Sequence, residues 1–150
     1  MIVKNAKLIP IEMVVRGYIT GVTGTSIWGS YEKGDRIIYG IKFKNGLRKN
    51  QKLLRPIITP TTKATQGHDK RLTKKEILKN KIVSKNVYSK MEKISLKLFE
   101  RGTKICEKKG LILVDTKYEF GIYPPAGGNK LILIDEIHTP DSSRFWIKKT

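Results

Sequence analysis

Hydrophobic and polar positions change their period along this chain, and each change predicts a different element. Residues 12–20 and 35–43 are rich in β-branched and aromatic side chains, which is typical of strands. From Thr73 to Ile105 apolar residues recur every three or four positions, which predicts helices. Two apolar runs, 111–121 and 130–137, enclose a Pro- and Gly-rich turn and predict a hairpin. This order predicts an α+β fold, an antiparallel sheet with helices packed on one face.

Local signals place the boundaries of these elements within a single domain, residues 1–150. Thr73 followed by Glu76 forms a capping box, which predicts the start of a helix. Ser84 is a candidate start for a second helix, and Gly110 is its expected left-handed end. Residues 52–72 contain two prolines and several polar turn formers, and we expect them to form a long loop.

Composition narrows the class of protein further. The chain has 31 Lys plus Arg against 13 Asp plus Glu, a net charge of +18, which favours anionic partners. A basic nucleic-acid-binding module is therefore an alternative, with Trp28, Tyr31, Tyr39 and Phe43 as candidate stacking residues, although no known nucleic-acid-binding motif accompanies them. The single cysteine and the lack of a signal peptide or an apolar membrane span predict a cytoplasmic protein.

The segment LILVDTKYEFG carries candidate chemistry on one side of a strand. Side chains alternate in a strand, so Asp115, Lys117 and Glu119 share a face opposite Tyr118 and Phe120. With a symmetric turn, Asp135 lies opposite Lys117 and diagonal to Glu119, about 7–8 Å away, within reach of one shared cation. Asp115 is roughly 13 Å from Glu119 along the strand and cannot share that ion. The alternative is a solvent-facing strand with ordinary ion pairs.

Other clusters add to this face. Glu12 and Arg16 are four residues apart on one face of the first predicted strand. The segment Asp141–Ser142–Ser143–Arg144 combines an acid, two hydroxyls and a guanidinium, a combination that can bind phosphate or carboxylate groups. Lys63, His68 and Asp69 lie in the long loop.

Together, the segments IPIEMVVRGYITG, PIITPTTKA, GHD, LILVDTKYEFG and LIDEIHTPDSSRFW resemble the SAICAR synthetase family, in order over nearly the whole chain. The resemblance implies an ATP- and Mg²⁺-dependent ligase of purine biosynthesis. In that family ATP phosphorylates the carboxylate of carboxyaminoimidazole ribonucleotide, and the amine of L-aspartate then displaces phosphate. Anionic substrates of this kind require cationic side chains and a divalent ion.

The resemblance also implies a role for each matching residue. Glu119 and Asp135 correspond to Mg²⁺ ligands, and Lys117 and Lys63 to contacts with the phosphates of ATP. Asp115, a catalytic acid beside Lys117, is expected to orient the incoming amine. The residues expected to bind the nucleotide and the two substrates are Glu12, Arg16, His68, Asp69, Asp141, Ser142, Ser143 and Arg144.

The chain departs from the family in two ways. Val22 stands where the family commonly has a serine that contacts substrate, and Thr23, Thr25 or Ser26 are candidates to replace it. The family's N-terminal lobe, with its loop over the ATP phosphates, and its C-terminal helices have no counterpart here. We therefore expect the 150-residue chain alone to have weak activity or none, and to associate with itself or with a separate lobe as a partner subunit.

Overall fold

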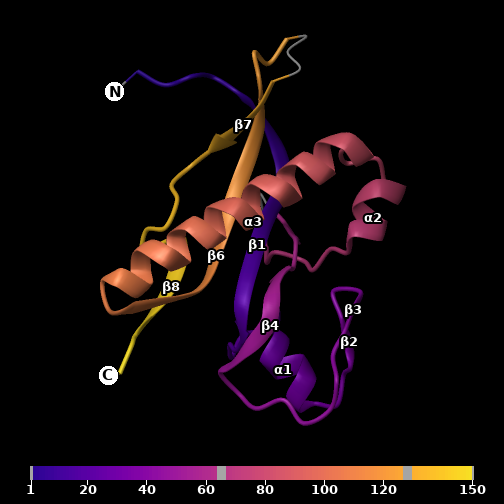
Figure 1. Ribbon diagram of the computed structural model, residues 1–150. Helices are drawn as coiled ribbons and strands as arrows, with labels where there is room; N and C mark the ends of the chain where they lie inside the picture. Colours follow the sequence, from indigo (N-terminus) through magenta and orange to yellow (C-terminus); the bar gives the residue numbers. More distant parts are fainter. Residues whose placement is uncertain (1, 64–66, 127–129, 150) are drawn as a thin grey trace.

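The computed structural model describes residues 2–63, 67–126 and 130–149, and its main feature is an antiparallel sheet crossed by a long helix (Figure 1). The strands of this sheet are β1 (Lys7–Ile19), β4 (Gln51–Ile58), β5 (Thr61–Thr62), β6 (Leu111–Tyr123), β7 (Lys130–Ile134) and β8 (Ser143–Ile147). Their order is β4-β1-β6-β7, with β5 also paired to β1 and β8 also paired to β6. The predicted α+β fold is confirmed.

Helices α2 and α3 begin at the caps that the sequence indicates, and α3 also ends before the predicted glycine, whereas the sequence did not indicate α1 (Ile27–Glu32). Helix α2 (Lys74–Lys79) starts with the capping box of Thr73 and Glu76. Helix α3 (Lys85–Lys108) starts at Ser84, whose hydroxyl accepts a hydrogen bond from the Val87 amide at 3.2 Å. After α3, Gly110 adopts a φ of 71°, a left-handed conformation that glycine tolerates without strain.

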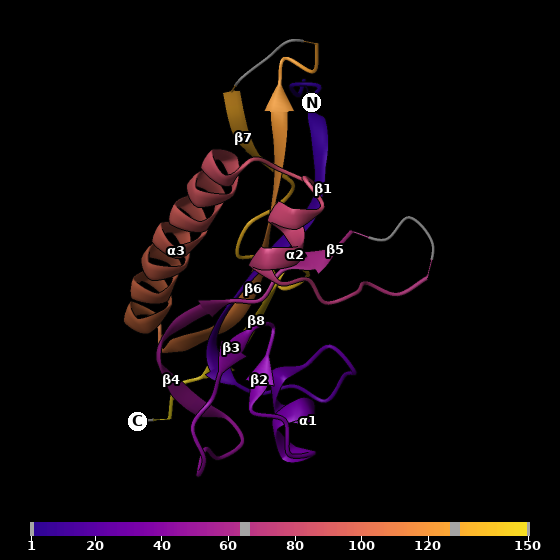
Figure 2. The same cartoon turned by 90° about the vertical axis from the view of Figure 1, so that its right-hand side faces the viewer.

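The main core lies between α3 and one face of the sheet. Met13 on β1 and Tyr118 and Phe120 on β6 are fully buried there, and so is Met91 on α3. Burying side chains of this size stabilises the fold by about 1.5–3 kcal/mol each. Figure 2 shows α3 along one side of strands β1 and β6. Because strand side chains alternate, the polar neighbours of these core residues face away from α3.

A second core cluster lies beside α1 (Ile27–Glu32), β2 (Ile37–Ile38) and β3 (Ile41–Lys42). The prediction of one strand over residues 35–43 is wrong, because Tyr39 and Gly40 both have positive φ and turn β2 back onto β3. Tyr31, Tyr39 and Phe43 are buried in this cluster. These rings cannot stack on bases, so the nucleic-acid alternative loses most of its proposed aromatic surface.

The long loop predicted over residues 52–72 is also corrected. Its first half forms β4 and β5, both paired to β1. Pro56 lies within β4, where it is tolerated because β4 is at the edge of the sheet. The first predicted strand, residues 12–20, starts earlier, at Lys7.

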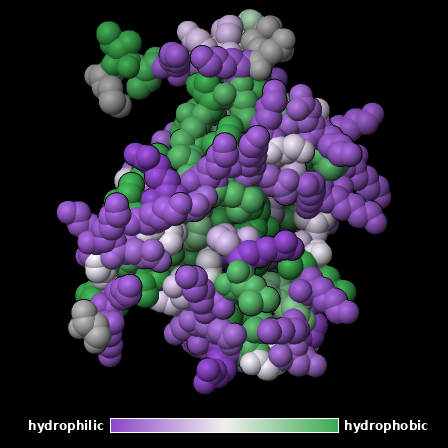
Figure 3. All heavy atoms as spheres, in the orientation of Figure 1, coloured by the Kyte–Doolittle hydropathy of each residue, from purple (hydrophilic) through white to green (hydrophobic). Residues whose placement is uncertain are grey.

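Much of the positive charge lies on the exposed side of the helices. Figure 3 shows hydrophilic side chains over the face that α3 occupies. Lys90, Lys93, Lys97 and Lys104 are all exposed on α3. No helix within residues 2–63, 67–126 and 130–149 is long and apolar enough to cross a membrane.

Candidate functional site

The sheet face opposite α3 carries the charged side chains that the sequence predicts. In the register of β1 with β6, Glu12 pairs with Glu119 and Arg16 pairs with Asp115. On the other side of β6, Asp115 pairs with Arg144 of β8. Paired residues of an antiparallel sheet point to the same face, so three adjacent strands present these groups together. The predicted division of β6 into a charged face and a core face is confirmed.

Arg16, Asp115 and Arg144 form a row across the three strands. Arg16 Nη1 lies 3.8 Å from Asp115 Oδ2, and Arg144 Nε lies 3.4 Å from Asp115 Oδ1. Arg16 Nε also donates a hydrogen bond of 2.7 Å to the Thr59 hydroxyl. Burial raises the pKa of Asp115 above its ordinary value, although both arginines act in the opposite direction. The carboxylate of Asp115 therefore becomes protonated at a higher pH than that of an ordinary aspartate.

One oxygen of this row has an ion-pair partner but no hydrogen-bond partner among the described residues. Asp115 Oδ2 is buried and makes no hydrogen bond to any residue that the structure describes, since its distance to Arg16 exceeds that of a hydrogen bond. A buried carboxylate oxygen normally has a donor, and leaving it without one costs about 1–3 kcal/mol or more. The arrangement fits a bound molecule that supplies an N–H or O–H group at this point.

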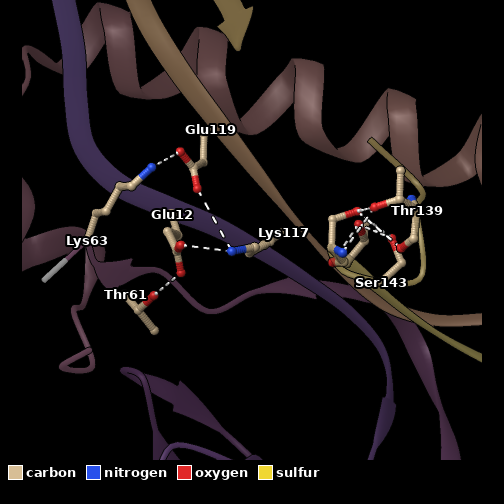
Figure 4. Close-up of polar contacts among 9 residues, drawn as sticks. Glu12, Thr61, Lys63, Lys117, Glu119, Thr139 and Ser143 are labelled. Atoms are coloured by element: carbon tan, nitrogen blue, oxygen red, sulfur yellow. Dashed lines mark hydrogen bonds and ion pairs between the residues drawn. The ribbon is translucent and has the colours of Figure 1, made fainter. Parts of the chain in front are cut away.

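A second cluster lies next to the row and contains two acids and two lysines (Figure 4). Lys117 Nζ lies 3.3 Å from Glu12 Oε1 and 3.9 Å from Glu119 Oε1. Lys63, just after β5, donates a hydrogen bond to Glu119 Oε2. Glu12 Oε2 also accepts a 3.3 Å hydrogen bond from the Thr61 hydroxyl. The two carboxylates are buried, whereas the lysine side chains are 35% and 38% exposed and can reach a ligand.

The electrostatics of this cluster are set by burial and by opposite charges. Burial disfavours the charged form of Lys117, but Glu12, Glu119 and Asp135 together raise its pKa above the ordinary value. Burial raises the pKa of Glu12, which Lys117 only partly offsets, and Asp69 and Glu119 raise it further. Lys117 therefore remains a cation at neutral pH, available for an anionic ligand.

The predicted geometry of the metal pair is corrected by the strand register. Ile134, not Asp135, ends β7 and pairs with Glu119, so Asp135 does not lie opposite Lys117 within the ladder. Asp135 instead follows the strand with a φ of 64°, which turns the chain away. The hairpin itself is confirmed, and Asp135 still lies near enough to Lys117 to contribute to its raised pKa.

The carboxylates of this site could supply only some of the ligands that a Mg²⁺ ion needs. Among the described residues, no group of three or more His, Cys, Asp or Glu side chains could hold a metal. Mg²⁺ is commonly held by one or two carboxylates together with phosphate oxygens and water. Glu119 and Asp135 are oxygen donors of the kind that such a site uses, and in this structure both oxygens of Glu119 face lysine side chains, Lys63 and Lys117.

Hydroxyl groups line the edge of the sheet between β7 and β8. The Ser143 hydroxyl lies 2.7 Å from that of Thr116, and the Ser142 hydroxyl lies 3.2 Å from that of Thr139 (Figure 4). The Ser142 carbonyl accepts a 3.0 Å hydrogen bond from the Lys117 amide, which continues the ladder where β7 has ended. Because Thr116 pairs with the core residue Val15 and with Ser143, the Ser143 hydroxyl lies on the core side of β6, and the structure does not bring it onto the charged face.

The remaining candidates lie further out. Asp141 is exposed and raises the pKa of Glu136 through a hydrogen bond between their carboxyl groups. His68 is exposed, whereas Asp69 lies near enough to Glu12 to influence its pKa. Val22 is 86% exposed.

Of the three residues that could replace the missing serine at position 22, Ser26 already has a structural task. Its hydroxyl accepts a 3.2 Å hydrogen bond from the Gly29 amide and caps α1. Thr23 and Thr25 are exposed or half-exposed, and their hydroxyls lie 3.4 Å apart. The two threonines are therefore the better candidates for contact with a ligand.

Sequence reasoning missed several residues that support the site. Thr59 and Thr61 bind Arg16 and Glu12, yet both lie in the segment predicted as a loop. The alternation in the segment TPTT after a β-rich run was the signal that could have found them. His138 contacts the core residue Tyr118, and no periodicity in the sequence indicates this contact.

Fold and site together define an α+β protein with a face of paired acidic and basic side chains on an open antiparallel sheet. The chain belongs to the SAICAR synthetase family, whose family model matches residues 1–150.

Curated relatives and solved structures agree with this assignment. The chain is 51% identical over 146 residues to a phosphoribosylaminoimidazole-succinocarboxamide synthase of Legionella pneumophila, covering 97% of this chain and 46% of that protein. It is 50% identical over 138 residues to the synthase of Bacteroides thetaiotaomicron, covering 91% of this chain and 41% of that protein. The chain thus spans about half the length of the curated relatives it matches.

Two solved structures share the fold. The SAICAR synthase of Saccharomyces cerevisiae, complexed with SAICAR, matches with a TM-score of 0.79 and 37% identity over 95% of this chain and 43% of that one. A type-2 SAICAR synthetase in complex with ADP matches with a TM-score of 0.71 and 32% identity, over 97% of this chain and 53% of that chain.

Proposed function

We propose that this chain provides the substrate-binding face of an ATP- and Mg²⁺-dependent ligase of purine biosynthesis. The reaction joins L-aspartate to carboxyaminoimidazole ribonucleotide and gives SAICAR. The observation that carries the proposal is the row Arg16–Asp115–Arg144 beside the cluster of Glu12, Lys117 and Glu119, all on one face of three paired strands. The relatives that share this fold include one with bound SAICAR and one with bound ADP.

The reaction consists of two transfers. The γ-phosphoryl group of ATP passes to a carboxylate oxygen of the imidazole nucleotide, giving an acyl phosphate and ADP. The amine nitrogen of aspartate then attacks the acyl carbon, phosphate leaves with the C–O bonding electrons, and the nitrogen loses a proton. A bound Mg²⁺ would neutralise charge on the phosphate oxygens, held by Glu119 and Asp135.

The chain's own residues bind and orient these groups. Lys117 and Lys63 are the accessible cations beside Glu119 and bind phosphate oxygens. Arg16 and Arg144 attract the carboxylates of the substrates. Asp115 Oδ2, which makes no hydrogen bond to a described residue, accepts a hydrogen bond from the attacking amine, and the raised pKa of Asp115 suits it to take the released proton.

Ligand binding by the chain tests this function. Isothermal titration with SAICAR and with Mg·ADP is expected to give saturable binding, and Lys117→Met is expected to weaken Mg·ADP by at least about tenfold through loss of one charge-assisted contact. Lys104→Met is the matched control, because Lys104 forms an exposed pair with Glu100 on α3. Equal affinities for the wild type and Lys117→Met would contradict the proposed role.

A further inference from the structure

The loop that joins β7 to β8 carries two of the predicted site segments, Asp135 and Asp141–Ser142. Another residue of this loop, His138, is held on the opposite side of the sheet from the charged face. Strand β7 pairs with residues 119–123 of β6, and β8 pairs with residues 111–116 of the same edge. The loop leaves this edge after Ile134 and returns at Ser142, whose carbonyl accepts the Lys117 amide. The loop therefore lies along the part of the β6 edge between residues 116 and 119, next to Lys117 of the charged face.

His138, at the middle of this loop, is held between the sheet and α3. Its Nε2 atom lies 2.6 Å from the hydroxyl of Tyr118, and the two rings meet edge to face with centroids 5.6 Å apart. Tyr118 is fully buried in the main core. Burial raises the pKa of the Tyr118 hydroxyl and lowers that of His138, which favours the neutral forms of both groups, and the imidazole tautomer determines which of the two donates the hydrogen bond.

Gly102 of α3 provides the space for the His138 ring. A methyl group at Gly102 would lie 2.6 Å from His138 Cε1 and 2.9 Å from both ring nitrogens, closer than real side chains approach. Gly102 is in the middle of a long helix, where glycine costs about 1 kcal/mol relative to alanine. The close approach of His138 gives a physical reason for glycine at this position.

The segment that follows His138 is held by hydrogen bonds, whereas the segment before it is exposed. On the C-terminal side, Thr139 and Ser142 form several hydrogen bonds with each other, and Ser143 begins β8. On the N-terminal side, Asp135 to Ile137 are exposed, and both Asp135 and His138 have positive φ, 64° and 55°. The direction of Asp135 is therefore determined by the end of β7 and by the anchor at His138.

We propose that His138 is a positioning residue that, through its contacts with Tyr118 and Gly102 behind the sheet, orients Asp135 toward the nucleotide phosphates in front of it. The role of Asp135 in this inference rests on the proposed function, whereas the anchoring of His138 does not.

The test compares three variants of the chain. Tyr118→Phe removes the hydrogen bond while keeping the ring. Gly102→Ala displaces the imidazole while improving helix propensity, and Ser89→Ala, at an exposed position of α3, is the helix-matched control. Amide hydrogen exchange of residues 135–139 is expected to be about fivefold faster in Tyr118→Phe, which corresponds to one hydrogen bond, and faster still in Gly102→Ala. Ser89→Ala should match the wild type.

The second measurement is the ratio of ADP affinities with Mg²⁺ and with EDTA. Gly102→Ala is expected to lower this ratio at least about fivefold and to leave the affinity in EDTA unchanged, which a general loss of stability would not do. Unchanged exchange at residues 135–139 in Gly102→Ala would overturn the anchor, whether or not the chain binds ADP. Faster exchange with an unchanged ratio would overturn the link from His138 to Asp135. Absence of ADP binding by the wild type would instead count against the proposed function.

Discussion

Replacing Arg16 by methionine probes the buried row that crosses β1, β6 and β8. The change keeps an unbranched apolar side chain but leaves the Asp115 carboxylate with Arg144 alone, whose side chain is 43% exposed. At an effective dielectric constant of 20, the lost attraction across 3.8 Å is about 4 kcal/mol. The lost hydrogen bond to Thr59 adds about 1 kcal/mol. Desolvation of Arg16 is relieved at the same time, so we expect a net loss of about 3–5 kcal/mol at pH 7.

The pH dependence of this loss distinguishes an uncompensated charge from simple loss of packing. Asp115 has a raised pKa in the folded protein, so the folded state binds a proton at a pH where the unfolded state does not. Stability from this protonation is present at low pH and disappears as the pH rises through the folded pKa. Removing Arg16 raises that pKa further. The loss should therefore shrink as the pH falls from 7 to 5, by up to about 1.4 kcal/mol per pH unit.

Urea unfolding followed by circular dichroism at pH 7, 6 and 5 measures this effect. Adding Asp115→Asn to the Arg16→Met background removes the stranded charge, so the double variant should be more stable than Arg16→Met at pH 7 and should lose the extra pH dependence. An Arg16→Met loss that is equal at pH 7 and pH 5, or below about 1 kcal/mol, would refute the reasoning.

Three further changes test other parts of the structure. Met91→Ala, in the fully buried core, should reduce the free energy of unfolding by about 2–5 kcal/mol, whereas Leu96→Ala on the exposed side of α3 should cost far less; urea unfolding compares them. Glu12→Gln removes a carboxyl with a raised pKa, so the gain in stability between pH 7 and pH 5 should be smaller than in the wild type, as thermal unfolding at both pH values would show. Val22→Ser, at an 86% exposed position, should leave stability unchanged within about 0.5 kcal/mol and tighten SAICAR binding about fivefold, measured by calorimetry.

Elements with a long, regular period were predictable from the sequence. Helix α3 begins at Ser84 as expected, because the cap and the apolar stripe indicate the same boundary. The alternation of Asp115, Lys117 and Glu119 predicts the charged face of β6, since a strand has only two faces. These features depend on neighbouring residues alone, so no tertiary information was needed.

Features that depend on distant segments were harder to predict. The assumption of a symmetric turn shifted the register of β6 with β7 by one residue, and register is determined by pairing along the whole hairpin. Residues 52–58 have β-branched side chains only at Ile57 and Ile58 and contain Pro56, yet they form β4, because β1 offers them an unpaired edge. His138 contacts Tyr118 twenty residues away in the sequence, and only the fold brings the two together.

Strand β1 lies at the centre of the sheet and pairs with β4, β5 and β6, while its adjacent residues point in opposite directions. Met13 and Val15 pack in the interior, and Glu12 and Arg16, their immediate neighbours, hold charges. Selection can thus act on foldability and on chemistry at alternate positions of one short peptide, largely independently. Inserting or deleting one residue in β1 would turn the core side chains toward the charged face and the charged side chains toward the core. The length of β1 should therefore vary far less during evolution than its amino-acid composition.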